Sequence, residues 1–533
     1  MGSEGWRTRR RTLVAAAGAL GLAVSLAAGC APSAPEEGSG EGTTLTIATT
    51  TDVANFNPLI GNSRTDYWVT NLMYPHLLTI APDGTKKPAL ATEWGYETPT
   101  KGFYEIRDDM KWSDGEKLTA EDVAFTLNAV KQDKPVGVLI GQMSNFASAE
   151  AVSPTRVELT LTKPDATLVP EIGFWGNVVP EHVFGKVPSV AKFANDSDWV
   201  SAGPYRLTKV AKGQSYTLKR VTPYPFAPGG TPKVGKVVYK VYPDVNTEIL
   251  ALKNGDVDVV ANALPPAQVD PLKNTDGVSV KRVPGLGYAH MTYNMTKKPL
   301  DDERVRRALA HAVDYESIRE VVLQGQAVST GSSPIPPMLR AHEPLEEYAF
   351  DPEESKRLLA DAGYGPNGKS LKLRMIYSLQ DPVTAQWTNL VKDDAAKAGI
   401  QIEPQGLERN TYLAKTAEGD FDVYAGNFAI MDDPATNMTL TYLPGGAINY
   451  SYVDDPKLSS LVTKAQATTD EAEQTQLVQQ AARIVHDNVY DNVMYTQHLY
   501  VAHRDSWTGF EVKPSELLSV VDPQSLANVA PAG

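Results

Sequence analysis

One short segment has the spacing of a phosphate-binding loop. Gly363–Ser370 fits the pattern G-x-x-x-x-G-K-[ST], in which backbone amides cradle a phosphate group. That chemistry needs a strand before the loop and a helix after it, because the helix N-terminus must face the phosphate. Here the flanking patterns predict a helix before and a strand after, and Pro366 lacks one of the required amides. We therefore predict a turn between a helix and a strand.

Carboxylates and histidines could carry other chemistry. Asp432 and Asp433 precede a proline, so they are either a pair of binding groups or an Asp-Pro turn. His311 and His486 fall near the apolar faces of predicted helices and are interpreted as packed structural residues. The sequence contains no HExxH motif, and no segment assembles a nucleophile, a base and an orienting group. We therefore expect neither an enzyme nor a metal or cofactor site.

Composition narrows the class of protein. The chain has 533 residues, of which 42% are hydrophobic and 21% charged, so it is globular and long enough for two or three domains. The net charge is −14, although four arginines lie among the first eleven residues. This acidic balance argues against binding to nucleic acid or anionic lipid. A single cysteine excludes a disulfide framework and a cysteine-rich metal site.

The N-terminus has the features of an export signal. A basic start is followed by a nearly unbroken run of apolar and small residues at Leu13–Ala28. As a helix this run spans about 24 Å, which is shorter than a hydrocarbon core of about 30 Å. We therefore predict a signal peptide at 1–29 rather than a membrane-spanning helix. Thr8–Leu13 also fits a twin-arginine signal, and an ordinary basic start remains the alternative.

The only cysteine lies where the apolar run ends. Leu26–Cys30 resembles the bacterial lipobox, which implies cleavage before Cys30 and attachment of a diacylglyceryl group to its sulfur. The alternative is an ordinary signal peptide with an incidental cysteine. Residues 31–42 are rich in Pro, Ser, Glu and Gly and are typical of a flexible tether. We expect an exported protein that is lipid-anchored to the outer face of the bacterial cytoplasmic membrane.

Strand and helix patterns alternate along the rest of the chain, which indicates a mixed α/β fold. The predicted strands are Thr44–Thr49, Phe103–Ile106, Val157–Leu161, Val237–Val241 and Leu371–Tyr377. The predicted helices begin at Thr119, Asp301-Asp302 and Asp351-Pro352 or span Thr247–Leu252 and Glu471–Val485.

Six segments, in the same order along the chain, resemble the signature of family 5 of the extracytoplasmic solute-binding proteins, the peptide- and nickel-binding type that serves ABC importers. The strongest is Lys111–Val123, which contains a Trp-Ser-Asp-Gly turn followed by a capped helix. The others are Gly203–Leu207, Leu252–Asp258, Tyr293-Asn294 with Arg304–Asp314, Asp351–Tyr364, and Asn449-Tyr450 with Asp455-Pro456. The signature residues are mainly structural, and the resemblance implies that Arg306 pairs within one lobe.

The resemblance implies an α/β, bilobal periplasmic-binding-protein-like fold with two lobes, a hinge and an extra subdomain on lobe one. The implied boundaries are a signal peptide at 1–29, the lipidated cysteine and tether at 30–42, lobe one at 43–75, 200–285 and 498–533, the subdomain at 76–199, and lobe two at 286–497.

The implied function is the capture of a small solute between the lobes and its delivery to an ABC permease of the cytoplasmic membrane. We expect a monomer that binds a peptide or peptide-like solute, with a sugar, a metal chelate or another small molecule as the alternative. A secreted hydrolase and a solute-sensing receptor are alternatives from other classes.

In peptide-binding members a lobe-two loop, aromatic-x-x-Asp-x-x-Asp/Glu-Pro, takes the peptide ammonium group. The matching stretch ends at Pro434 and places Asn427 at the aromatic position and Ile430 at the amine-binding position. Since an isoleucine cannot neutralise a buried ammonium, recognition of a free peptide N-terminus is not expected unless Asp432 substitutes. The candidate solute-binding residues are Asn427, Phe428, Ile430, Asp432 and Asp433 in this loop, with Asn55, Phe56, Asn57, Tyr377, Arg409 and Tyr412 added by position.

Overall fold

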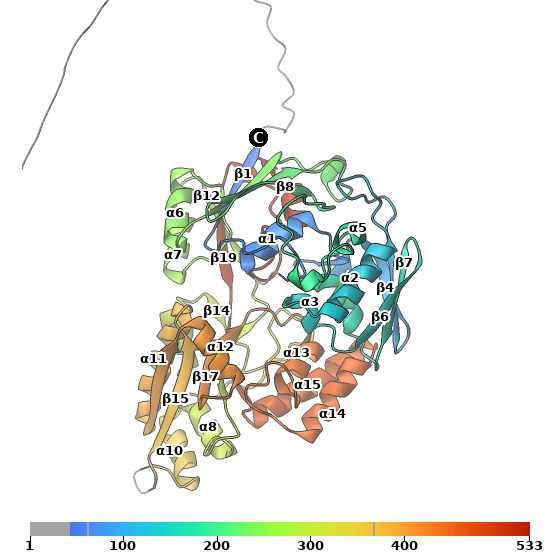
Figure 1. The fold of residues 1–533 in the computed structure, drawn as a ribbon. Helices are drawn as coiled ribbons and strands as arrows, with labels where there is room; N and C mark the ends of the chain where they lie inside the picture. The colour runs from blue at the N-terminus through green and yellow to red at the C-terminus, as the bar shows by residue number, and fades with distance from the viewer. Residues whose placement is uncertain (1–42, 61–62, 366–367) are drawn as a thin grey trace, which may run out of the picture. The chain divides into compact units, whose positions relative to one another are not determined.

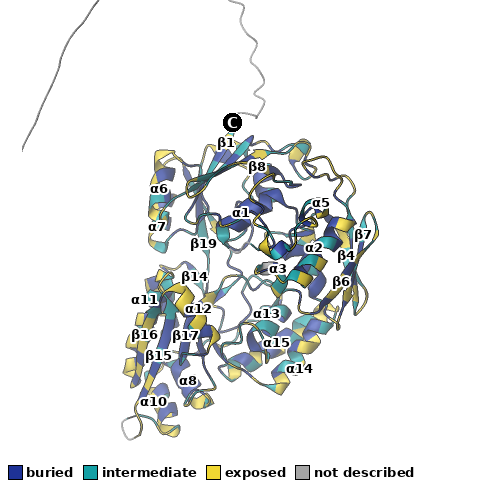
Figure 2. Ribbon diagram, viewed as in Figure 1, coloured by how far each residue is buried: buried dark blue, intermediate teal, exposed yellow. Residues whose placement is uncertain are grey.

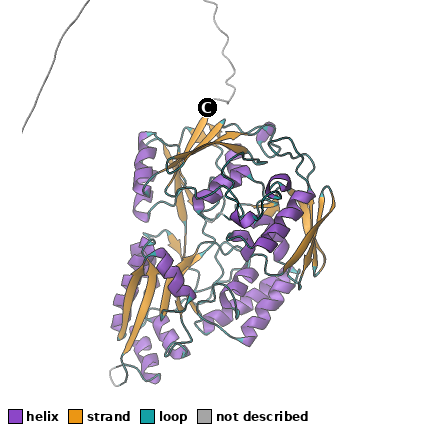
Figure 3. Cartoon of the chain, viewed as in Figure 1, coloured by secondary structure: helices purple, strands orange, loops and turns teal. Residues whose placement is uncertain are grey.

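The computed structural model describes residues 43–60, 63–365 and 368–533. The predicted signal peptide, Cys30 and the tether lie outside these residues, as does Pro366. Three sheets with helices packed on them carry the described fold (Figures 1 and 3). We name the part around the seven-stranded sheet lobe one, the part around the four-stranded sheet the subdomain, and the part around the six-stranded sheet lobe two. The residue boundaries predicted for these parts stay a prediction.

Lobe one is built on a mixed sheet with the strand order β12-β19-β11-β1-β10-β9-β8. Its strands are β1 (Thr44–Thr49), β8 (Tyr205–Ala211), β9 (Ser215–Arg220), β10 (Lys236–Val241), β11 (Val259–Val260), β12 (Val278–Val283) and β19 (Leu499–Arg504). β1 runs parallel to β10 and β11, and the other neighbours are antiparallel. The alternation predicted for β1 sends Leu45 and Ile47 to one face and Ala48 to the other.

Helices cover both faces of this sheet. The Ala48 face packs against α6 (Val245–Asn254) and α7 (Pro266–Lys273), and the Leu45 face packs against α1 (Arg64–Met73) and α16 (Pro523–Asn528). Short elements complete lobe one: η3 (Pro228–Gly230), β20 (Trp507–Thr508) and β21 (Ala530–Pro531). A separate pair of strands, β2 (Leu78–Ile80) and β3 (Lys86–Pro88), lies beside the subdomain, where β2 contacts α4 and β3 contacts β4. Figure 2 shows buried residues concentrated on the strands and exposed ones on outer helix faces such as that of α6.

The subdomain has an antiparallel sheet in the order β4-β5-β7-β6, and its core is continuous with that of lobe one. Its elements are β4 (Ala91–Thr98), β5 (Lys101–Ile106), α2 (Ala120–Asp133), α3 (Val138–Gly141), β6 (Phe146–Ser153), β7 (Arg156–Leu161), α4 (Leu168–Trp175), α5 (Glu181–Phe184) and η2 (Val190–Lys192). The Trp112 indole donates to Asp122 (3.1 Å), which also accepts the Thr119 amide (3.0 Å). These bonds join the tryptophan turn to the start of α2, as the capped-helix pattern predicts.

Lobe two contains a mixed sheet in the order β14-β18-β13-β17-β15-β16. Its strands are β13 (Tyr288–Tyr293), β14 (Ala327–Val328), β15 (Leu371–Ser378), β16 (Ile400–Leu407), β17 (Val423–Phe428) and β18 (Asp491–Gln497). One face is covered by α8 (Glu303–His311), α10 (Pro352–Asp361) and α11 (Pro382–Lys397), with α9 (Tyr315–Ser317) and the π-helical turn η4 (Ile318–Val322) nearby. The remaining helices are α12 (Arg409–Ala417), α13 (Pro434–Tyr442), α14 (Pro456–Ala467) and α15 (Glu471–Asp487), the last three of which pack together.

Local signals place several of these elements. α8 and α10 begin after Asp302 and Asp351, whose carboxylates accept backbone amides of the first turn. The Gly363–Ser370 segment follows α10 and precedes β15, the order opposite to that of a phosphate-binding loop. The Arg306 guanidinium donates to the backbone carbonyls of Leu300, Asn488 and Val489, so its partners within lobe two are carbonyls.

Two short crossovers connect the lobes. Residues 284–287 lead from β12 to β13, and His498 alone separates β18 from β19. A Cβ atom at Gly287 would overlap the carbonyl oxygen of Phe428, so only glycine lets the end of β17 pass this close to the crossover. Within the described part of the chain, no helix has the length and apolar character that crossing a membrane requires.

Candidate functional site

The loop after β17 lies against lobe one. The Met431 amide donates to the carbonyl oxygen of Leu286 in the crossover (2.7 Å), and Ile430 pairs with Leu286 through a parallel bridge. The Ile430 side chain is half-buried and packs against the hydrophobic core of lobe one. The residue at the expected amine-binding position therefore makes an apolar contact between the lobes.

Asp432 forms an ion pair with Lys86, which comes from β3 on the lobe-one side. The Lys86 ammonium also lies 3.2 Å from the carboxylate of Glu171 on α4 and 3.9 Å from the ring centre of Phe174. The side chains of Asp432 and Glu171 are 5% and 3% exposed, so water screens these charges little. We call Lys86, Glu171, Asp432 and Asp433 the interlobe charge cluster.

Burial sets the protonation of this cluster. It raises the pKa of Glu171 to about 8, with Asp432 adding to the rise and Lys86 opposing it. Burial lowers the pKa of Lys86, but Asp432 and Glu171 outweigh that effect and hold it above its ordinary value. Burial also raises the pKa of Asp433. Burial and the neighbouring Asp432 therefore favour the protonated form of Glu171, while Lys86 keeps its charge.

Asp433 has a second, structural role. Its carboxylate accepts the Thr436 amide (2.7 Å) and caps α13, which begins at Pro434. Asp433 therefore both forms the Asp-Pro turn that begins α13 and belongs to the charge cluster. The adjacent helices add contacts with the subdomain: the Thr436 hydroxyl donates to the hydroxyl of Thr167 at 2.9 Å.

Phe428 leads to a buried polar network in lobe two. Its ring centre lies 4.3 Å from that of His290, whose Nδ1 is 2.9 Å from both carboxylate oxygens of Asp491. Asp491 also accepts the hydroxyls of Thr292 (2.7 Å) and Tyr442 (2.9 Å). Nε2 of His290 has no hydrogen-bond partner among the described residues. Thus β17 brings Phe428 against a histidine that the sequence prediction did not include.

The three candidates after β1 lie in lobe one. Asn57 is fully buried, and its amide donates to the carbonyls of Val190 (2.8 Å) and Phe193 (2.7 Å). Phe56 is buried in the core, edge-on to Trp199 and Tyr216. Asn55 is half-buried and accepts the Asn57 amide at 2.9 Å. These contacts give Phe56 and Asn57 structural roles, and contact of the three with a solute stays a prediction.

The other lobe-two candidates lie on β15, on α12 and near the end of β17. Tyr377 is half-buried on β15, and Arg409 is exposed at the start of α12. Tyr412 is buried; its ring stacks on Tyr424, and its hydroxyl donates to the Ala425 carbonyl (3.1 Å). Asn427 is exposed and donates to Asp381. The structure therefore brings Ile430, Asp432 and Asp433 together between the lobes, whereas the contacts of Tyr412 and Asn427 lie within lobe two.

Several residues of the site carried weak sequence signals. Glu171 is the one carboxylate in the apolar helix Leu168–Trp175, and His290 lies in the fully buried strand Tyr288–Tyr293. A lone ionisable residue in such a segment indicates a specific partner. Lys86 begins the short strand β3 and carried no such signal. His311 and His486 both pack on Tyr348, in accord with structural roles.

We searched the described residues for a group of side chains that could bind a metal ion. In the described ranges, no three or more His, Cys, Asp or Glu side chains are grouped so that they could hold an ion. The charge cluster already contains a lysine, whose ammonium takes the place that a cation would occupy between Asp432 and Glu171.

Comparisons with known proteins agree on one family. The family described as "Bacterial extracellular solute-binding proteins, family 5 Middle" matches residues 85–449. The dipeptide-binding protein of Escherichia coli (strain K12) is 25% identical over 488 residues, covering 86% of this chain and 90% of that protein.

Two solved structures show the same fold. The ABC transporter substrate-binding protein CtaP of Listeria monocytogenes has a TM-score of 0.82 at 22% identity, covering 92% of this chain and 99% of its own. NikZ of Campylobacter jejuni in complex with Ni(L-His) has a TM-score of 0.79 at 21% identity, covering 91% and 99%.

Proposed function

Because the chain belongs to family 5 of the bacterial extracellular solute-binding proteins, the non-enzymatic solute-binding components of ABC importers, we propose that it captures a peptide or peptide-like solute between its lobes. The loaded protein then delivers the solute to a permease of the cytoplasmic membrane. We further propose that a lipid on Cys30 holds it at the outer face of that membrane, where the tether keeps it near the permease.

The observation that carries this proposal is the contact of the Asn427–Pro434 loop with lobe one. The loop joins lobe-two strand β17 to Lys86 and Leu286, so any hinge motion about the crossovers would change its surroundings. A solute held beside this loop would be enclosed when the lobes close. Closure would also remove water, which strengthens polar contacts to the solute.

The charge cluster narrows the chemistry of the solute. Asp432 already has an ammonium partner in Lys86, and Ile430 offers no charge to a second ammonium. A free peptide N-terminus would have to displace Lys86 or remain unpaired in a buried site, which is costly. We therefore propose a peptide-like solute whose amino end is blocked or is not bound by this loop.

Mass spectrometry of small molecules released by denaturing the purified protein tests the solute class. Peptide masses would support the proposal, whereas a single sugar or metal-chelate mass would contradict it. If nothing is released, a thermal-shift screen of peptides, sugars and metal chelates takes its place, and stabilisation by a non-peptide alone would contradict the proposal equally.

A pair of matched peptides tests the role of Lys86. An N-acetylated peptide should bind at least as tightly as the same peptide with a free amino end. In Lys86→Met the preference should reverse, because Asp432 then lacks its cation. Lys87→Met is the control, since Lys87 is the exposed neighbour on the same strand. A free-amine preference in the unmodified protein would refute this role.

A further inference from the structure

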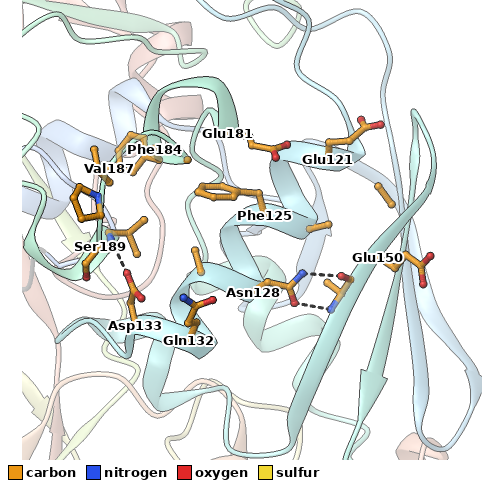
Figure 4. A pocket seen from close by; sticks show the side chains of 17 residues that line it. Glu121, Phe125, Asn128, Gln132, Asp133, Glu150, Glu181, Phe184, Val187 and Ser189 are labelled. Carbon is orange, nitrogen blue, oxygen red and sulfur yellow. Dashed lines mark hydrogen bonds between the residues drawn. The ribbon is translucent and has the colours of Figure 1, made fainter.

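A cavity of about 500 Å³ lies in the subdomain, between α2, the strand β6 and the segment 181–190. It shares no residue with the interlobe charge cluster or with the loop after β17. Its volume falls within the range of pockets that hold small ligands. We call it the α2 groove (Figure 4).

The groove follows one face of α2 along almost the whole helix. Its lining residues on α2 recur at helical spacing from Glu121 to Asp133, which at 1.5 Å per residue is a length of about 18 Å. An extended chain rises about 3.3 Å per residue, so about five residues fit this length. Ala124 and Ala129 on the same face leave room for such a chain.

Hydrogen bonds hold the walls in place. The Asn128 amide group donates to the carbonyl of Ala149 (2.8 Å) and accepts its amide (3.0 Å), so it pairs with β6 as a neighbouring strand would. At the other wall, Asp133 accepts the amide of Val190 (2.7 Å). A binding partner would therefore meet a groove that is already formed, which lowers the entropic cost of association.

The lining combines an apolar centre with an acidic end. Phe125 is half-buried in the groove, and its ring lies beside Gly185. Figure 4 shows Glu121 and Glu181 together at one end, beside Phe125. Both are exposed, and among the described residues that line the groove none is a lysine or arginine.

We infer that the α2 groove binds an extended basic polypeptide segment of a partner protein, with an apolar side chain against Phe125 and basic side chains at Glu121 and Glu181. We infer basic residues because the end of the groove is acidic. We infer an extended chain because of the length of the groove and its preformed walls. This inference is independent of the solute proposed for the interlobe site, because the two sites share no residue.

Fluorescence anisotropy with a labelled, end-capped pentapeptide of alternating lysine and leucine or phenylalanine tests the inference, with the protein first saturated with its released solute so that the interlobe site is occupied. The double variant Glu121→Gln/Glu181→Gln should weaken binding at least tenfold, as should a peptide with glutamine in place of lysine. The control Glu316→Gln/Glu320→Gln removes the same charge from exposed positions in lobe two and should leave binding within twofold. Circular dichroism should show unchanged folding in both variants.

Three results would overturn the inference. The peptide could fail to bind, it could bind the double variant as tightly as the unmodified protein, or spermidine could compete as well as the peptide and show that charge alone is recognised. The double variant should retain the solute released from the unmodified protein. Loss of the peptide with retention of that solute therefore separates the groove from the interlobe site.

Discussion

Glu171 should make the protein less stable as the pH rises, and the substitution Glu171→Gln should remove that effect. The folded protein raises the pKa of this buried carboxyl from 4.5 to about 8. Between these two values the unfolded chain has lost the proton and the folded chain keeps it. Folding must then take up a proton, so the free energy of unfolding falls as the pH rises through this range.

The size of the effect follows from the two pKa values. One pH unit corresponds to about 1.4 kcal/mol while the unfolded carboxyl is ionised and the folded one is protonated. Between pH 5 and pH 7.5 the unmodified protein should therefore lose about 3 kcal/mol relative to Glu171→Gln. Glutamine resembles the protonated carboxyl in shape, so any constant difference in its hydrogen bonds to Lys86 and Trp175 cancels between the two pH values.

Urea unfolding of both proteins at pH 5, 6, 7 and 7.5 measures this difference. Glu248→Gln is a matched control: burial also raises the pKa of Glu248 to about 8, but that residue lies on α6 in a separate hydrophobic cluster of lobe one. Like Glu171→Gln, the Glu248→Gln variant should remove one carboxyl's contribution to the pH dependence of stability. Unlike Glu171→Gln, it should leave solute binding unchanged. A stability difference between Glu171→Gln and the unmodified protein that stays constant over this range would refute the reasoning about burial.

Three further changes have expected outcomes. Lys86→Met should lower the free energy of unfolding by about 3–5 kcal/mol in urea titrations, since it leaves buried carboxylates without their cation; adding Asp432→Asn should restore part of it, and no recovery would contradict the ion pair. Gly287→Ala should cost about 1–3 kcal/mol because its Cβ would overlap Phe428, whereas Gly141→Ala has open space and should be neutral. Cys30→Ser should abolish partition of the expressed protein into a detergent phase; unchanged partition would contradict lipidation.

Local sequence signals predicted the elements well because they act over a few residues. Asp302 and Asp351 cap helices where an acidic residue precedes an apolar stripe at helical spacing. The alternation in Thr44–Thr49 predicted a strand whose faces enter two different cores. The family resemblance then supplied the arrangement of lobes, which no local pattern determines.

The charge cluster could not be predicted in the same way. Lys86 and Asp432 are separated by 346 positions, and their pairing depends on how β3 and the loop after β17 meet across the lobes. The match ending at Pro434 placed Ile430 at the amine-binding position and left Asp432 as a possible substitute. It could not show that the cation beside Asp432 comes from the protein itself, because the short strand Lys86–Pro88 has no distinctive sequence pattern.

Because the cluster lies between the lobes, we expect its protonation to change when the lobes close. Opening would admit water to Glu171, whose pKa is raised first by burial, and would separate it from Asp432 and Asp433, which add to that rise in this structure. The open form should therefore release the Glu171 proton near neutral pH, and closure around a solute should take one up. Solute affinity should rise as the pH falls from 7.5 toward 5, by up to about tenfold per pH unit. Calorimetric titrations in buffers of different ionisation enthalpy measure that proton directly. Glu171→Gln should bind with no proton uptake from this site, and an equal uptake in both proteins would assign the proton to another group.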